Sequence, residues 1–76
     1  MKLTPLGSNR TQVEYNNGTL IFFSYKTPVA GYSRDLGFVR TEDYYSVTTS
    51  RHINQWLENV EAQKVSQETI NNLVGN

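Results

Sequence analysis

The sequence predicts an α+β protein: a small antiparallel sheet of about four strands, arranged as a meander, with two C-terminal helices packed on one face. The first observation is a change of the apolar period near residue 48, from strand-like alternation to a helical repeat. The second is Asn17-Gly18, a hairpin signal between two strand-like runs. We expect a single domain over residues 1–76, with the sheet in about 1–47 and the helices in about 49–75.

The first predicted hairpin is centred on Asn17-Gly18, because both residues tolerate the positive φ angles of a type I′ turn. A two-residue loop pairs Val13 with Phe22 and puts both on one face, whereas Ile21 falls on the other. The second strand is therefore apolar on both faces. Such a strand is either covered on both sides or carries an exposed apolar patch that marks a partner site.

A second hairpin is predicted from the segments VAGYS and GFVRT, which the loop RDLG joins. Gly37 suits the left-handed position that closes this loop. Pro28 stands just before the hairpin and indicates a turn or a sheet edge there. The segment YYSV, residues 44–47, is expected to add a short further strand.

The first helix is predicted from an apolar stripe with the spacing i, i+3, i+4 and i+7. The stripe consists of Ile53, Trp56, Leu57 and Val60. We expect Trp56 to lie in the core, and the helix to begin among Thr48, Thr49 and Ser50, which are all good N-caps.

The second helix has clearer boundaries. Ser66 is the expected N-cap, Val65 and Ile70 form a hydrophobic staple, and Gly75 stands at the C-terminal end. Its apolar face is expected to hold Ile70, Leu73 and Val74.

Composition limits the kinds of site that the chain can carry. It has no cysteine and one histidine, so we expect neither a disulfide framework nor a metal centre, and no cofactor. The first ten residues lack the apolar core of a signal peptide, and no apolar run approaches the roughly 20 residues that cross a bilayer. We therefore expect a soluble intracellular protein without a membrane partner.

The formal net charge is +0, although the two halves of the chain differ in sign. Residues 1–40 hold five Lys or Arg against two acidic residues, and residues 41–76 hold two against five. Non-specific binding to nucleic acid depends on many cations that neutralise phosphates. A neutral chain therefore favours a protein partner over nucleic acid.

The segment YYSVTTSRHINQW, residues 44–56, gathers hydroxyls, rings, an arginine and the only histidine at the start of the first helix. A helix N-terminus attracts anions, so the hydroxyls with Arg51 and His52 form a candidate phosphate site. The alternative is that the hydroxyls cap the helix and Arg51 lies on the surface. Tyr and Arg are also the residues that dominate protein-binding surfaces. The candidate partner-binding residues are Tyr32, Arg34, Arg40, Tyr44, Thr49, Ser50, Arg51 and His52.

An enzyme is not expected. Ser50 and His52 point in different directions on a helix, and Ser24 or Ser46 reaches His52 only through the fold. The sequence has no Gly-x-Ser-x-Gly motif and no acid placed to orient the imidazole.

Two segments, FSYKTPVA at Phe23–Ala30 and YSVTTSRHINQWL at Tyr45–Leu57, precede the short helix expected over Ser66–Val74. Together they resemble the signature of a group of small uncharacterised proteins of tailed bacteriophages and prophages. The resemblance implies a phage origin and action in the cytoplasm of the bacterial host, and it transfers no activity. Small phage proteins of this size include many that bind and inhibit host factors.

We therefore expect a binding protein that acts on a host macromolecule, such as an inhibitor of host defence of the anti-CRISPR or another anti-defence type. The first alternative is a nucleic-acid-binding accessory protein that uses the helix N-terminus with Arg34, Arg40 and Arg51. The second alternative is a virion component or another structural protein that forms a homo-oligomer.

Overall fold

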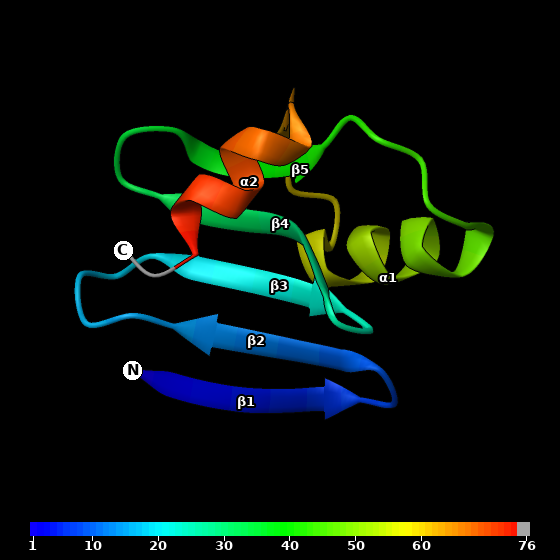
Figure 1. Ribbon diagram of the computed structural model, residues 1–76, viewed down its shortest axis with the longest axis horizontal. Helices are drawn as coiled ribbons and strands as arrows, with labels where there is room; N and C mark the ends of the chain where they lie inside the picture. The colour runs from blue at the N-terminus through cyan, green and yellow to red at the C-terminus, as the bar shows by residue number, and fades with distance from the viewer. Residues whose placement is uncertain (75–76) are drawn as a thin grey trace.

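The structure is a computed structural model that describes residues 1–74 (Figure 1). The α+β class is confirmed, but the sheet has six strands where about four were expected. The elements in chain order are β1 (Lys2–Gly7), β2 (Arg10–Glu14), β3 (Leu20–Ser24), β4 (Thr27–Ser33), β5 (Gly37–Thr41), α1 (Val47–Leu57), β6 (Gln63–Val65) and α2 (Gln67–Leu73). Neighbouring strands follow the chain order, so the expected meander is present.

The sheet is mixed, because β6 pairs with β5 in parallel while all other pairs are antiparallel. Parallel neighbours need a long crossover connection, and α1 supplies it between β5 and β6. The expected division into a sheet followed by helices is therefore wrong at residues 63–65. The strand expected over 44–47 is absent, since residues 44–46 form no regular element and Val47 begins α1.

The turn between β2 and β3 has three residues instead of two. Tyr15 N–H donates to Thr19 O at 2.9 Å, Gly18 N–H donates to Tyr15 O at 3.0 Å, and Gly18 has φ +90°. This is the geometry of a three-residue hairpin loop that ends in a left-handed residue. Val13 consequently lies opposite Ile21, one residue from the predicted partner. A shift of one residue moves each side chain to the other face, so the predicted face assignment is wrong.

The two helices pack on opposite faces of the sheet, not on one face as expected (Figure 1). Phe22 of β3 packs against α1 residues Ile53 and Leu57, while its neighbour Ile21 packs against Ile70 of α2. The physical reason is that α1, as the crossover helix, covers one face and leaves the other to α2. The alternative that β3 is covered on both sides is therefore confirmed.

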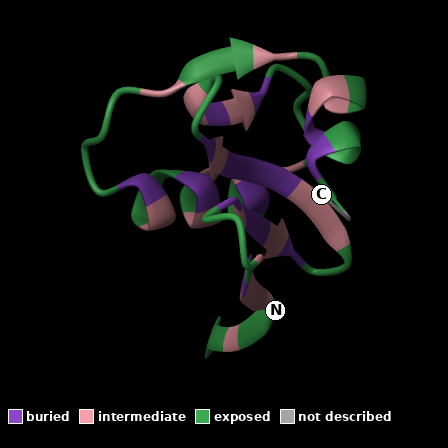
Figure 2. Cartoon of the chain, turned by 90° about the vertical axis from the view of Figure 1, so that its left-hand side faces the viewer, coloured by how far each residue is buried: buried purple, intermediate pink, exposed green. Residues whose placement is uncertain are grey.

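Burial follows this arrangement (Figure 2). Buried residues concentrate in the central strands and in the sides of the helices that face them, while β1 is exposed along most of its length. Pro5 of β1 lies opposite Thr11 of β2, and Leu3 is 61% exposed on the same strand. The β1–β2 end of the sheet therefore extends beyond the part that the helices cover.

Two backbone signals were predicted in the β3–β4–β5 region, and one is confirmed. Gly37 closes the β4–β5 loop at φ +72°, as predicted. The turn or sheet edge expected at Pro28 is not there, because the turn falls earlier, at residues 25–26, and β4 lies between β3 and β5. Pro28 is the second residue of β4 and stands beside an irregularity in the β3–β4 register. Val29 is the extra residue there, so Val29 and Ala30 both face α1.

The helix starts are set by hydroxyl caps. The N-cap of α1 is Ser46, whose Oγ accepts from Thr49 N–H at 3.0 Å, so the expected start among residues 48–50 is late. The expected N-cap of α2 is confirmed, because Ser66 Oγ accepts from Thr69 N–H at 3.2 Å. Val65 packs in the same cluster as Ile70, as the predicted staple requires.

Two residues expected on the apolar faces of the helices lie outside them. Val60 lies beyond the end of α1 and is 43% exposed, so it does not join the apolar stripe. Val74 is also exposed, so the inner face of α2 consists of Ile70 and Leu73. Gly75, the predicted end of the second helix, lies outside the described residues.

A substitution of Ile70 tests whether α2 stabilises the second face of the sheet. Ile70 is fully buried, so Ile70→Ala should lower the free energy of unfolding by about 2–5 kcal/mol in urea denaturation. Val60→Ala removes a comparable apolar group from an exposed position and should change it by less than about 0.5 kcal/mol. Equal free energies of unfolding for the two variants would show that the packing of α2 does not stabilise this face of the sheet.

Candidate functional site

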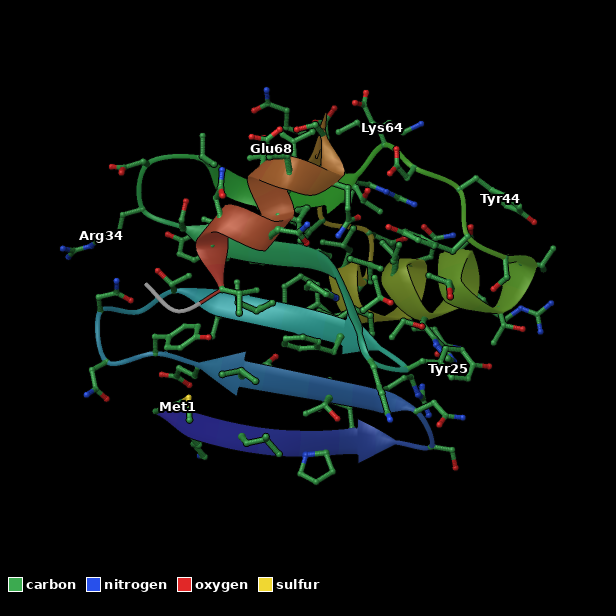
Figure 3. The ribbon with its side chains drawn as sticks, in the orientation of Figure 1. Met1, Tyr25, Arg34, Tyr44, Lys64 and Glu68 are labelled. Carbon is green, nitrogen blue, oxygen red and sulfur yellow. The ribbon has the colours of Figure 1, made fainter. Side chains whose placement is uncertain are left out.

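The site begins where two hairpin turns meet α1. Asn9, in the β1–β2 turn, and Tyr25, in the β3–β4 turn, both have positive φ angles, 60° and 58°. Tyr25 N–H donates to Asn9 O at 2.7 Å and so joins the two turns. A positive φ is strained for an aromatic residue, and such strain is often found at functional sites. Figure 3 shows Tyr25 beside α1 at this end of the sheet.

His52 of α1 contacts the last residue of β3, Ser24, and the turn residue that follows it, Tyr25. Its Nδ1 lies 2.9 Å from Ser24 Oγ, and its ring centroid lies 6.0 Å from that of Tyr25. Ser24 Oγ also lies 3.2 Å from Thr49 Oγ1, one turn before His52 on α1. These hydroxyls fix the orientation of the imidazole, so that its other ring nitrogen is left for external contacts.

The protonation of His52 is shifted by its surroundings. Burial lowers the pKa of His52 below its ordinary value, and the positive charges of Arg10 and Arg51 lower it further. The imidazole is therefore neutral at neutral pH. One nitrogen of a neutral imidazole donates and the other accepts, so the hydrogen bond with Ser24 is satisfied in either tautomer.

A groove of about 550 Å³ lies beside His52, between α1 and the β1–β2 hairpin. We call it the α1 groove. It is lined by Leu6, Arg10, Gln12, Phe22, His52, Gln55, Trp56 and Glu58. The lining combines aromatic surface with side-chain amides, one guanidinium and one carboxylate, and this mixture of apolar walls and a few polar groups is typical of binding sites.

The walls of the α1 groove are held by contacts between its own residues. Trp56 stacks on Phe22, with ring centroids 5.4 Å apart and an interplanar angle of 14°. The indole Nε1–H of Trp56 donates to Gln12 Oε1 at 2.9 Å, which accounts for its partly buried position. Arg10 Nη1–H donates to Gln55 Oε1 at 2.8 Å. The expected core position of Trp56 is thus met only in part, since one side of the residue lines the groove.

The serine–histidine pair that the fold assembles favours a structural role for Ser24. Ser24 is only 2% exposed and is held between Thr49 and His52, so its hydroxyl has no open path to a substrate. Within residues 1–74, no group of three His, Asp or Glu side chains gathers to hold a metal ion. The geometry instead supplies hydrogen-bond donors and acceptors around an aromatic floor.

Two of the predicted binding residues, Thr49 and His52, meet at this site. Ser50 is half-buried on the same helix and donates its N–H to Ser46 O as part of the first turn. Arg51 is exposed and acts on His52 through its charge. Of the hydroxyls at the start of α1, those of Ser46 and Thr49 are therefore already engaged in capping and in the contact with Ser24.

The other predicted residues do not gather there. Tyr44 is 71% exposed before α1, and Arg34 is exposed in the β4–β5 loop at the opposite end of the molecule (Figure 3). Tyr32 packs its ring against Phe38, 4.8 Å between centroids. Arg40 on β5 donates from Nη1 to Asn54 Oδ1 at 3.1 Å.

Four residues of the site are not among the binding residues predicted from the sequence. They are Arg10, Gln12, Tyr25 and Gln55. The available signal was the tight SYKT turn, because a two-residue hairpin turn without glycine forces a side-chain-bearing residue to positive φ. No local pattern indicates the two glutamines, since their roles depend on contacts 44 and 45 residues away in the chain.

The fold and the groove define a small α+β protein whose mixed sheet is covered on both faces and carries a preformed groove at one end. The chain belongs to the family of unknown function DUF8033, which it matches over residues 1–72. No curated protein and no solved structure matches it. Neither α1 nor α2, the two helices of the described chain, has the length and apolar character needed to cross a membrane.

The lowered pKa of His52 predicts how stability changes with pH. The unfolded chain takes up the proton near the ordinary pKa of about 6.5, before the folded protein does, so the folded state loses stability as pH falls below that value. His52→Gln removes this titration and keeps a polar group near Ser24. In urea denaturation at pH about 7.5 and about 5.5, the wild type should lose more stability on acidification than the variant. An equal loss in both proteins would contradict the assignment.

Proposed function

We propose that this protein is a non-enzymatic binding protein that docks a partner protein in the α1 groove. The proposal rests on one observation: Trp56, Arg10 and His52, which line the groove, are each fixed by a hydrogen bond to another side chain of the protein. Trp, Tyr and Arg supply most of the binding energy at protein interfaces. Side chains that are already fixed lose little entropy when the partner arrives.

The charge of the groove supports a protein partner over nucleic acid. Its lining contains one cation, Arg10, and one anion, Glu58, beside the neutral His52. Arg34 lies at the far end of the molecule, and Arg40 is engaged with Asn54. A phosphate backbone needs several cations in a row, and this arrangement does not provide them.

The partner that we propose is a host protein, as the resemblance to tailed-phage proteins implies. By binding this partner, the protein would inhibit a defence system of the host. An alternative is an accessory protein for nucleic acid. A homo-oligomeric structural protein is the other alternative, and the exposed apolar side chains of Leu3 and Leu6 on β1 favour it.

A capture experiment with matched variants tests the docking site. Gln55→Glu replaces the amide oxygen that accepts from Arg10 with a carboxylate, so it occupies the one cation of the groove and adds a negative charge there, and Gln55 is exposed, so the fold tolerates the change. Gln63→Glu makes the same change on the exposed β6 strand at the other end of the sheet. From lysate of the bacterial host, Gln55→Glu should retain at least about tenfold less of the protein that the wild type captures, and Gln63→Glu should retain it fully. Undiminished capture by Gln55→Glu would refute docking in the groove.

Nucleic-acid binding is tested by fluorescence anisotropy with duplex DNA and with single-stranded RNA. At about 0.15 M salt, where the Debye length is roughly 8 Å, we expect no binding in the micromolar range. Micromolar or tighter binding, weakened equally for all sequences by Arg34→Ala or Arg51→Ala, would put the accessory-protein alternative first.

A further inference from the structure

We propose that the segment of the partner that enters the α1 groove presents an acidic side chain, whose carboxylate is bound by Arg10 and His52. This inference rests on the proposed function, because it names the chemistry of the group that the groove receives. It is carried by the position of Arg10, by the charges around His52 and by the groove that joins them.

Arg10 is a guanidinium that is held in place without an acidic partner within residues 1–74. It is half-buried at the start of β2, and its plane lies close to Gly7, where any Cβ would collide with it. Its Nη1–H donates to the neutral amide oxygen of Gln55, and its Nε, which is shielded from solvent, has no hydrogen-bond partner among residues 1–74. A guanidinium prefers a carboxylate, which accepts two parallel hydrogen bonds from it.

The surroundings of His52 add to the attraction for an anion. The groups that face it are Tyr25 from the β3–β4 turn, Arg10 from β2, and Arg51 and Glu58 from α1. Burial lowers the pKa of His52 most, and the charges of Arg10 and Arg51 lower it further, so these two side chains contribute a positive potential at the imidazole, although Glu58 lines the same groove. A carboxylate beside both cations offsets that potential.

The same arrangement makes the binding pH-dependent. A bound carboxylate favours the protonated imidazole, so it raises the pKa of His52 from its lowered value. Protonated His52 donates from both nitrogens, one towards Ser24 and one towards the ligand. Affinity for an acidic segment should therefore increase as pH falls from about 7.5 to about 6, a range in which a glutamate, with a pKa of about 4.3, stays ionised.

Nuclear magnetic resonance with two capped peptides tests the inference directly. The peptides Gly-Glu-Glu-Gly and Gly-Gln-Gln-Gly differ only in charge, and each is titrated to about 10 mM, which detects binding in the millimolar range. The Glu peptide should shift the side-chain signals of Arg10 and His52 and the indole N–H of Trp56, and should bind at least about tenfold more tightly than the Gln peptide. The affinity should rise at the lower pH.

Two variants and one small anion complete the test. Arg10→Gln should abolish the preference for the Glu peptide, whereas Lys64→Gln, which removes one cation from the exposed β6 strand, should keep it. The amide spectrum of each variant shows whether the fold is intact. The inference is overturned if a folded Arg10→Gln variant still prefers the Glu peptide. It is also overturned if inorganic phosphate shifts the same signals as much as the Glu peptide does.

The results separate this inference from the proposed function. If both peptides shift the groove signals equally, the groove binds peptide without selecting acid, and only the inference fails. If neither peptide produces a shift, the inference fails as well, while the capture experiment with Gln55→Glu still decides whether the groove is the docking site.

Discussion

The apolar character of β3 on both of its faces is the constraint on which the rest of the structure depends. Ile21 and Phe22 are adjacent in sequence and almost completely buried, on opposite sides of the sheet. In water, a small sheet with this strand at its centre exposes apolar surface on at least one side unless two elements cover it. The chain meets this requirement by sending one helix across each face, and it uses the parallel β5–α1–β6 connection to do so.

The candidate site results from the same placement of α1 on the sheet. Because α1 covers the centre of one face but not the β1–β2 end, a groove is left between the helix and the first hairpin. Trp56 spans the boundary, since it packs on Phe22 towards the core and lines the groove on its other side. Trp56 therefore contributes both to the core and to the wall of the groove, and a change at this residue alters both.

Local signals in the sequence predicted the elements whose geometry is set locally. Gly37 and Ser66 act as predicted, because a left-handed loop residue and a hydroxyl cap depend on near neighbours alone. Strand β6 has only three residues, too few to show the alternation of apolar and polar residues that marks a strand. Its partner is β5, which is separated from it in the chain by α1. The site was missed for the same reason: Arg10 and Gln55 are 45 residues apart, and only the tertiary fold brings them together.

Pro5 has a consequence for how the sheet ends. Tyr15 N–H points to β3, and since backbone groups alternate along a strand, those of Val13 and Thr11 point there too. The backbone groups of Pro5, opposite Thr11, therefore face the open edge of β1, where proline offers no donor. An incoming strand finds its hydrogen-bonding ladder interrupted at that point, which resists growth of the sheet into aggregates. At this end of the sheet, the molecule therefore presents side chains rather than a continuous row of free backbone groups.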